Sequence, residues 1–173
     1  MAQRAETWLF PDKPGPSYLE LIDFVPKKDG MTIPKPAISL VPWLGNAGAF
    51  EVILELAEHG RAIGHPSDLI ANGLGQLVAD QQAMLAEKAD SESARTKLIA
   101  VADRFIRAKI SGSSALYLNR RILHHLDLAL ERPATIAFLA VPRSFEIWTM
   151  EFYERIRAKL ADTISEHTTR LGL

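Results

Sequence analysis

The sequence predicts a mainly α-helical fold, a bundle of about five helices preceded by a proline-rich and largely extended N-terminal arm. Seven of the ten prolines lie between Pro11 and Pro42, apolar residues recur at helical spacing after residue 46, and glycines stand where such helices would end. Proline removes a backbone donor and disfavours helical geometry in the residue before it. The chain therefore divides into an arm, residues 1–45, and a helical bundle domain, residues 46–173.

The arm carries too many large apolar side chains for a solvated tail, and two local structures compete within it. Ser17 and Glu20 have the spacing of a capping box, which favours a short helix at this point. The alternative is a hairpin of two strands, 18–25 and 31–41, that turns at Gly30. A short helix followed by extended chain is the slightly favoured prediction.

The rest of the chain divides into helical segments by the spacing of its apolar residues. The run "ATIAFLAV" between Pro133 and Pro142 is apolar all round, so it fits a buried short helix or a buried strand equally well. No internal repeat is evident. The expected helices span about 47–59, 66–88, 92–110, 114–131 and 145–169.

Composition restricts both the chemistry and the location of the protein. The 173 residues contain no Cys, which excludes disulfides, thiolate metal sites and cysteine nucleophiles. No apolar run approaches the roughly 20 residues that span a bilayer, and no signal-peptide pattern opens the chain. We therefore expect a cytoplasmic protein that does not contact a membrane.

Charge is distributed unevenly along the chain. Residues 1–90 hold 7 Lys and Arg against 12 Asp and Glu, a net charge of −5, whereas residues 91–173 hold 13 against 9, a net charge of +4. A basic stripe on two neighbouring helices would suit a phosphate backbone, although an ordinary solvated helix face explains the same pattern and is favoured. The candidate nucleic-acid-binding residues are Lys97, Arg104, Arg107, Arg120 and Arg121.

The sequence contains none of the familiar catalytic or metal-binding motifs, since H-E-x-x-H, G-x-S-x-G and the phosphate-binding loop are all absent. His124 and His125 are adjacent, so on a helix they point about 100° apart and do not share one metal easily. His59 and His65 with a carboxylate are a weaker alternative. We predict no enzyme activity, no metal and no cofactor.

Aromatic residues of the arm suggest a protein interface, because Trp8, Phe10 and Trp43 each bury a large apolar area when they dock. We therefore predict a non-catalytic interaction or assembly subunit that docks onto other protein chains, or onto copies of itself, through its arm and one bundle face. Two alternatives remain open. One is a helical nucleic-acid-binding component of a nucleoprotein assembly, and the other is a bundle that binds a small molecule or metal, or acts as an enzyme, through His59 or His124.

Overall fold

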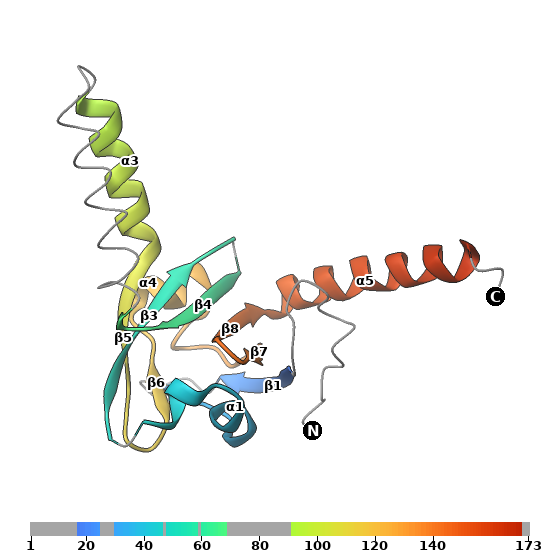
Figure 1. The fold of residues 1–173 in the computed structure, drawn as a ribbon, viewed down its shortest axis with the longest axis horizontal. Coiled ribbons are helices and arrows are strands. Elements are labelled where there is room, and N and C mark those ends of the chain that lie inside the picture. Colours follow the sequence, from blue (N-terminus) through green and yellow to red (C-terminus); the bar gives the residue numbers. More distant parts are fainter. Residues whose placement is uncertain (1–16, 25–29, 47, 59, 69–90, 171–173) are drawn as a thin grey trace.

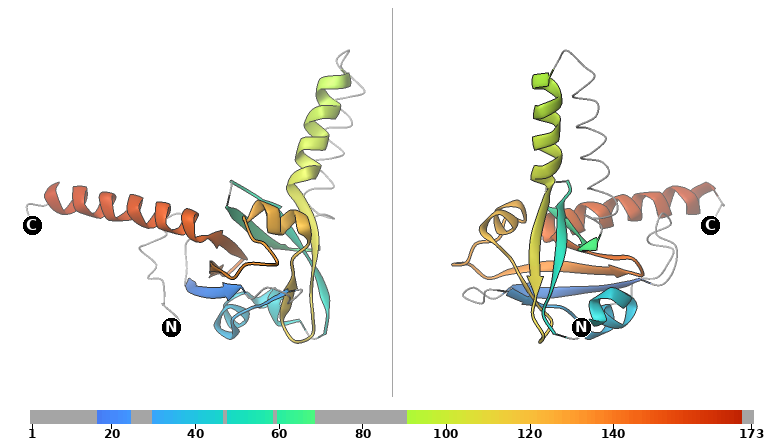
Figure 2. Two further views of the ribbon diagram at one scale, coloured as in Figure 1. Left: turned by 180° about the vertical axis from the view of Figure 1, so that it is seen from behind. Right: turned by 60° about the vertical axis from the view of Figure 1, so that its left-hand side comes forward.

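The computed structural model describes residues 17–24, 30–46, 48–58, 60–68 and 91–170. These residues form one antiparallel sheet of eight strands in the order β1-β7-β8-β4-β3-β5-β6-β2, which curls into a nearly closed barrel (Figure 1). The predicted mainly α-helical bundle is therefore wrong. The two longest helices of the described part, α3 and α5, project from the barrel in different directions (Figure 2).

The described elements follow one another along the chain as strands interrupted by short helices. The strands are β1 (Tyr18–Phe24), β2 (Gly30–Thr32), β3 (Phe50–Leu56), β4 (Arg61–Pro66), β5 (Phe105–Ile110), β6 (Ala115–Tyr117), β7 (Ala134–Val141) and β8 (Ser144–Thr149). The helices are α1 (Lys35–Leu40), the 3₁₀ helix η2 (Pro42–Gly45), α3 (Ser91–Arg104), α4 (Arg120–His125) and α5 (Met150–Arg170).

The order of these elements repeats. A strand, a short strand, a short helix and two hairpin strands appear first as β1, β2, α1, β3 and β4, and again as β5, β6, α4, β7 and β8. β1 pairs with β7, and β5 pairs with β3, so the first long strand of each half lies against the other half. The last strands, β4 and β8, pair with each other. The barrel thus has a pseudo-twofold internal repeat, contrary to the expectation from the sequence.

The repeat is also seen in the residues that lie opposite each other in the two strand pairs that join the halves, β1–β7 and β5–β3. Ile22 lies opposite Ile136 in the β1–β7 pair, and Ala108 lies opposite Val52 at the equivalent place in the β5–β3 pair. All four side chains belong to the interior cluster or pack against it. The residue types differ between the two halves at both of these positions. The halves therefore share strand pairing and burial here, and a comparison of their residue identities does not reveal the repeat.

The predicted helix over 47–59 is strand β3 in the structure. Val52 and Leu54 point into the core, whereas Glu51 is exposed and Glu55 lies on the outer face, where it contacts other polar side chains. This alternation has the period of two that a strand requires. Over a segment this short, apolar residues at 50, 53 and 54 fit a helical face as well, which is why the spacing was misleading.

One more predicted helix changes partly into a strand, and the segment left open between helix and strand is a strand. The helix predicted over 92–110 ends at Arg104, and its last residues form β5, whose burial alternates. The apolar run "ATIAFLAV" is the strand β7, which is buried on both faces. The helix predicted over 66–88 lies almost entirely outside the described residues.

The helix predicted over 114–131 is reduced to the short helix α4. Its first turn is capped by Asn119, whose side-chain oxygen accepts a hydrogen bond from the backbone N–H of Ile122 at 2.9 Å. Asp127, shortly after the helix, adopts a φ of 51°, which breaks the helical path. The fully buried Ile122 and nearly buried Leu126 fix α4 against the barrel.

Replacing Asn119 by alanine should destabilise the protein by about 0.5–2 kcal/mol, because the N–H of Ile122 loses its acceptor at the start of α4. Urea denaturation followed by tryptophan fluorescence measures this difference. Ser39→Ala is the matched control, since the exposed Ser39 hydroxyl donates only a long bond of 3.4 Å to the carbonyl oxygen of Lys35. Equal stability of the Asn119 variant and the wild type would contradict the capping role.

The described part of the predicted arm contributes to the same sheet and core as the rest of the chain. Tyr18–Phe24 is a strand, so the favoured short helix is wrong and the first strand of the alternative is right. The second strand, predicted over 31–41, ends at Thr32, and the two strands form no hairpin because β1 pairs with β7 and β2 with β6. After β2, the chain forms α1 and η2. Ala37 and Val41 from this region are completely buried in the interior cluster.

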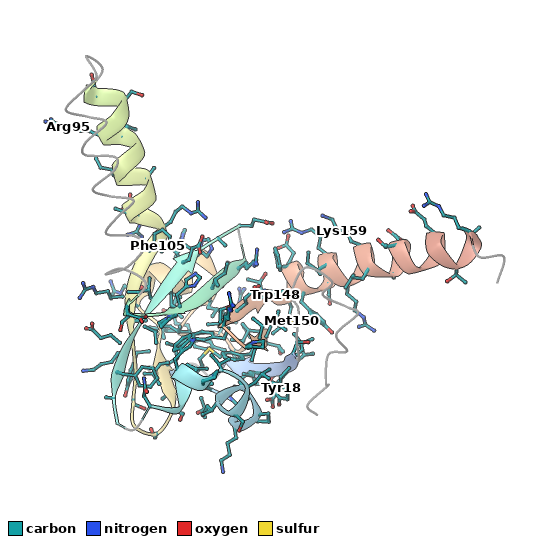
Figure 3. All side chains as sticks on the ribbon, viewed as in Figure 1. Tyr18, Arg95, Phe105, Trp148, Met150 and Lys159 are labelled. Atoms are coloured by element: carbon teal, nitrogen blue, oxygen red, sulfur yellow. The ribbon has the colours of Figure 1, made fainter. Side chains whose placement is uncertain are left out.

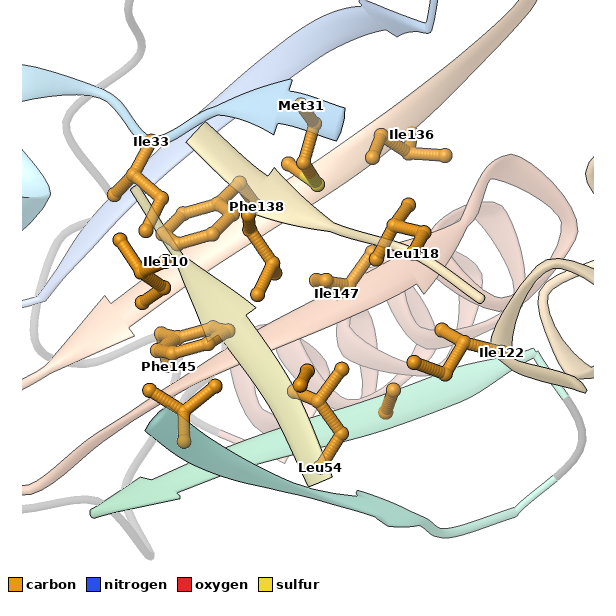
Figure 4. Packing of buried hydrophobic residues seen from close by; sticks show 14 of the residues in the cluster. Met31, Ile33, Leu54, Ile110, Leu118, Ile122, Ile136, Phe138, Phe145 and Ile147 are labelled. Atoms are coloured by element: carbon orange, nitrogen blue, oxygen red, sulfur yellow. The ribbon is translucent and has the colours of Figure 1, made fainter. Parts of the chain in front are cut away.

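Two apolar clusters hold the barrel together. The interior cluster includes Phe138 and Phe145, whose rings stack with centroids 5.2 Å apart (Figure 4). The outer cluster lies on the opposite side of β7 and β8, where the start of α5 covers the sheet. Its buried members are Leu19, Ala137, Leu139, Val141, Trp148 and Phe152. No helix in the described ranges is long and apolar enough to cross a membrane.

Candidate functional site

The start of α5 is fixed to the outer cluster. Phe152 is buried, and its ring packs edge-on against Trp148 with centroids 5.1 Å apart. Tyr153 and Ile156 are half-buried against the same cluster. At 1.5 Å per residue, the 21-residue helix is about 31 Å long. Most of that length extends beyond the sheet (Figures 1 and 2).

Beyond Ile156, α5 keeps an amphipathic sequence although the sheet no longer covers it. Leu160 follows Ile156 by one helical turn on the same face, and Ile164 continues the spacing in the sequence. Ala158, on the opposite side of the helix, is exposed to solvent. Side chains along this part, including Lys159, extend away from the barrel (Figure 3). We call residues 157–170 the free part of α5.

The charges of α5 are balanced and grouped. One flank of the apolar face carries Arg155, Lys159, Asp162 and Glu166, at spacings of four, three and four residues. All four side chains are exposed, and the guanidinium of Arg155 also lies 5.0 Å from the ring centroid of Phe152. From the N-terminal to the C-terminal end of α5, this flank therefore carries two basic side chains followed by two acidic ones. Counting the whole helix, the acidic residues are Glu151, Glu154, Asp162 and Glu166, and the basic ones are Arg155, Arg157, Lys159 and Arg170.

A buried ion pair joins the two halves of the barrel between β4 and β8. The side chain of Glu146 is 1% exposed, and Arg61 donates to both of its oxygens, from Nε at 2.8 Å and from Nη2 at 3.0 Å. Trp148 Nε1 donates to the same carboxylate at 2.7 Å. The hydrogen bond with Glu146 is the main cause that raises the pKa of Arg61 above its usual value. This pair is a structural element, since every carboxylate oxygen already has a donor.

The outer face of the first half carries polar side chains beside the buried Ile53, whereas that of the second half is apolar. Glu55 and His65 occupy the positions that correspond by pseudosymmetry to Leu139 and Trp148. Glu55 contacts His65 Nε2 at 2.9 Å and accepts a hydrogen bond from Arg104 at 2.7 Å. The apolar outer surface on which α5 packs therefore belongs to the second half of the barrel.

Carboxylates neutralise most of the predicted nucleic-acid-binding residues. Arg120 is exposed at the start of α4, and Lys97 lies in α3 with a side chain outside the described set. Arg107 lies in strand β5, so the predicted stripe along two helices is not formed, and Arg121 of α4 instead pairs with Asp103 of α3. The predicted helical nucleic-acid-binding component is therefore wrong. The ion pairs are Arg104–Glu55 at 2.7 Å, Arg107–Glu51 at 3.7 Å and Arg121–Asp103 at 3.2 Å.

The predicted docking surface of arm and bundle is also wrong, because the described residues form a barrel and not a bundle that could supply the second face. Trp43, one of the three aromatic residues assigned to it, contacts its own barrel. Its Nε1 donates to the carbonyl oxygen of Arg143 at 3.0 Å, and its ring centroid lies 5.8 Å from that of Phe145. Trp8 and Phe10 lie outside the described residues.

The structure does not support the predicted bundle that binds a metal or small molecule. Within the described ranges, no group of three or more His, Asp or Glu residues is placed to hold a metal ion. His124 is exposed on α4, next to the half-buried His125, whose Nε2 lies 2.8 Å from the carbonyl oxygen of Arg61. His59 lies outside the described residues.

No protein-family model matches the chain, and no curated protein matches it either. Function is therefore inferred from the structure, and the free part of α5 is the feature that bears on it. The sequence did predict the apolar stripe of this helix, but assigned it to the inside of a bundle. In the sequence, the feature of this helix that favours an interface is the grouping of charged residues beside its apolar stripe.

Proposed function

We propose that this protein self-associates, and that the occupant of the amphipathic face of the free part of α5 is a second copy of the chain. The observation that carries the proposal is the contrast within α5. Phe152 is buried on the outer cluster, whereas Leu160, two turns later on the same face, is half-buried and belongs to neither apolar cluster of the barrel. A helix of about three to four turns is marginal in water on its own, so packing of its apolar face stabilises it.

Charge balance favours a second copy as the occupant over a strongly acidic or basic partner. α5 carries four acidic and four basic side chains, so its net charge is zero with neutral His167. A partner of one charge sign would meet as many repulsive as attractive contacts. Another α5 offers an opposite charge for each group on the flank. A cytoplasmic location, and binding to any other protein, stay predictions from the sequence.

Sedimentation equilibrium of the full chain from about 1 to 200 μM tests the proposal. A helix pair of this length lies at the small end of specific interfaces, so we expect a dimer with a Kd on the order of 10 μM. Leu160→Glu places a charge in the apolar contact and should weaken the dimer at least tenfold, by roughly 1.4 kcal/mol or more.

Ala158→Glu is the matched control, because Ala158 is exposed on the side of α5 away from the apolar stripe. Its dimer affinity should remain within about twofold of the wild type. Circular dichroism of both variants checks that the barrel is folded. A wild-type protein that stays monomeric over the whole range, or equal affinities of the Leu160 and Ala158 variants, would refute self-association through α5.

A further inference from the structure

We infer that the two α5 helices pair in antiparallel orientation, an inference that rests on the proposed self-association. The order of charges along one flank of the helix, basic at Arg155 and Lys159 and acidic at Asp162 and Glu166, carries it. When two helices pack antiparallel, the same flank of each faces the other. When they pack parallel, a flank faces the opposite flank of its partner.

Antiparallel pairing makes this flank complementary to itself. Reversal of one helix about the midpoint between Leu160 and Ala161 places Lys159 opposite Asp162 of the partner subunit and Arg155 opposite the partner's Glu166, and the symmetry of the dimer repeats both contacts. The contact between Lys159 and Asp162 belongs to the free part of α5. It does not require the base of the helix, where Phe152 and Tyr153 already pack on the barrel.

Parallel pairing lacks this match. The opposite flank of α5 carries Glu154, Arg157, Ala161 and Thr168, of which only Glu154, at the base of the helix, is acidic. In a parallel dimer Lys159 would therefore lie near Arg157 of the partner subunit, and Glu166 near uncharged side chains. Both barrels would also lie at the same end, because each is attached to α5 at Met150. Antiparallel pairing instead places the two barrels at opposite ends of the helix pair.

Charge reversal distinguishes the two orientations. Lys159→Glu and Asp162→Lys should each raise the dimer Kd by about threefold to tenfold, since each creates two like-charge contacts. The double variant Lys159→Glu/Asp162→Lys should recover wild-type affinity. An equimolar mixture of the two single variants should form a heterodimer that is tighter than either homodimer. Failure of both the double variant and the mixture to recover affinity would overturn the antiparallel arrangement.

Disulfide trapping gives an independent test, because the wild-type chain has no Cys. Under mild oxidation, a mixture of Arg155→Cys and Glu166→Cys chains should form mixed disulfide dimers, whereas each variant alone should crosslink poorly. Eleven residues separate the two positions, about 16 Å along the helix axis, which is too far for a disulfide between equal positions in an antiparallel pair. Efficient 155–155 and 166–166 crosslinks would show a parallel dimer, refuting this inference and leaving self-association intact. Absence of any crosslink together with a monomeric wild type would refute both.

Discussion

Replacing Gly64 by alanine should lower the free energy of unfolding by about 3 kcal/mol or more. A Cβ atom at this position would lie 2.1 Å from Cζ and 2.2 Å from Cε1 of Phe145, far inside contact distance. The ring has no room to retreat, since Phe145 is completely buried and stacks on Phe138. Gly64 on β4 therefore leaves the space that the ring of its partner residue on β8, Phe145, occupies.

Urea denaturation measures the loss, and Gly45→Ala is the matched control. Nothing lies within 4 Å of a Cβ added at Gly45, so this change should alter stability by less than about 1 kcal/mol. Adding Phe145→Leu to Gly64→Ala should recover part of the loss, because a smaller side chain vacates the clashing position. Additive effects of the two substitutions, or a Gly64 variant as stable as the wild type, would show that the barrel relaxes around the extra methyl group.

Gly64 also shows why the sequence predicted the wrong fold. It lies in a segment with Pro66 and Ser67 that was interpreted as the start of a helix, and no local feature reveals that Phe145 packs on it. More than 80 residues separate these two positions in the chain. The same holds for β1 with β7, where pairing depends on residues more than 100 positions apart. Periodicity describes neighbours in the chain, whereas this barrel is built from exchanges between its two halves.

What could be predicted was local. The helix predicted over 145–169 is correct over α5, where the spacing holds for 21 residues, long enough to exclude a strand. It is wrong for 145–149, which belong to strand β8. A strand over Tyr18–Phe24 is one of the two alternatives that the sequence offers, because a possible turn follows it. The sequence predicts only part of the candidate interface. Its apolar stripe was identified, but its exposure follows from where the sheet ends, and only the assembled barrel determines that.

Replacing Glu146 by alanine should lower the free energy of unfolding by about 3–5 kcal/mol, because it leaves the guanidinium of Arg61 without its partner between β4 and β8. The same change removes the acceptor of Trp148 Nε1, and with it one contact that orients the indole in the seat of α5. Urea denaturation gives the stability. Glu58→Ala is the control, since Glu58 is largely exposed and reaches Arg61 only at 4.0 Å, so it should cause no measurable loss.

The double variant Arg61→Leu/Glu146→Leu distinguishes the net contribution of the ion pair to stability from the destabilisation caused by leaving one buried charge unpaired. Apolar residues in place of both partners remove the buried charge, so the double variant should be more stable than Glu146→Ala and within about 2 kcal/mol of the wild type. A double variant as unstable as Glu146→Ala would show that the pair itself, and not the unpaired Arg61, supplies the stability. If the indole keeps its place in that variant, the dimer affinity should also match the wild type, because α5 is seated on Trp148 through its ring and not through its hydrogen bond.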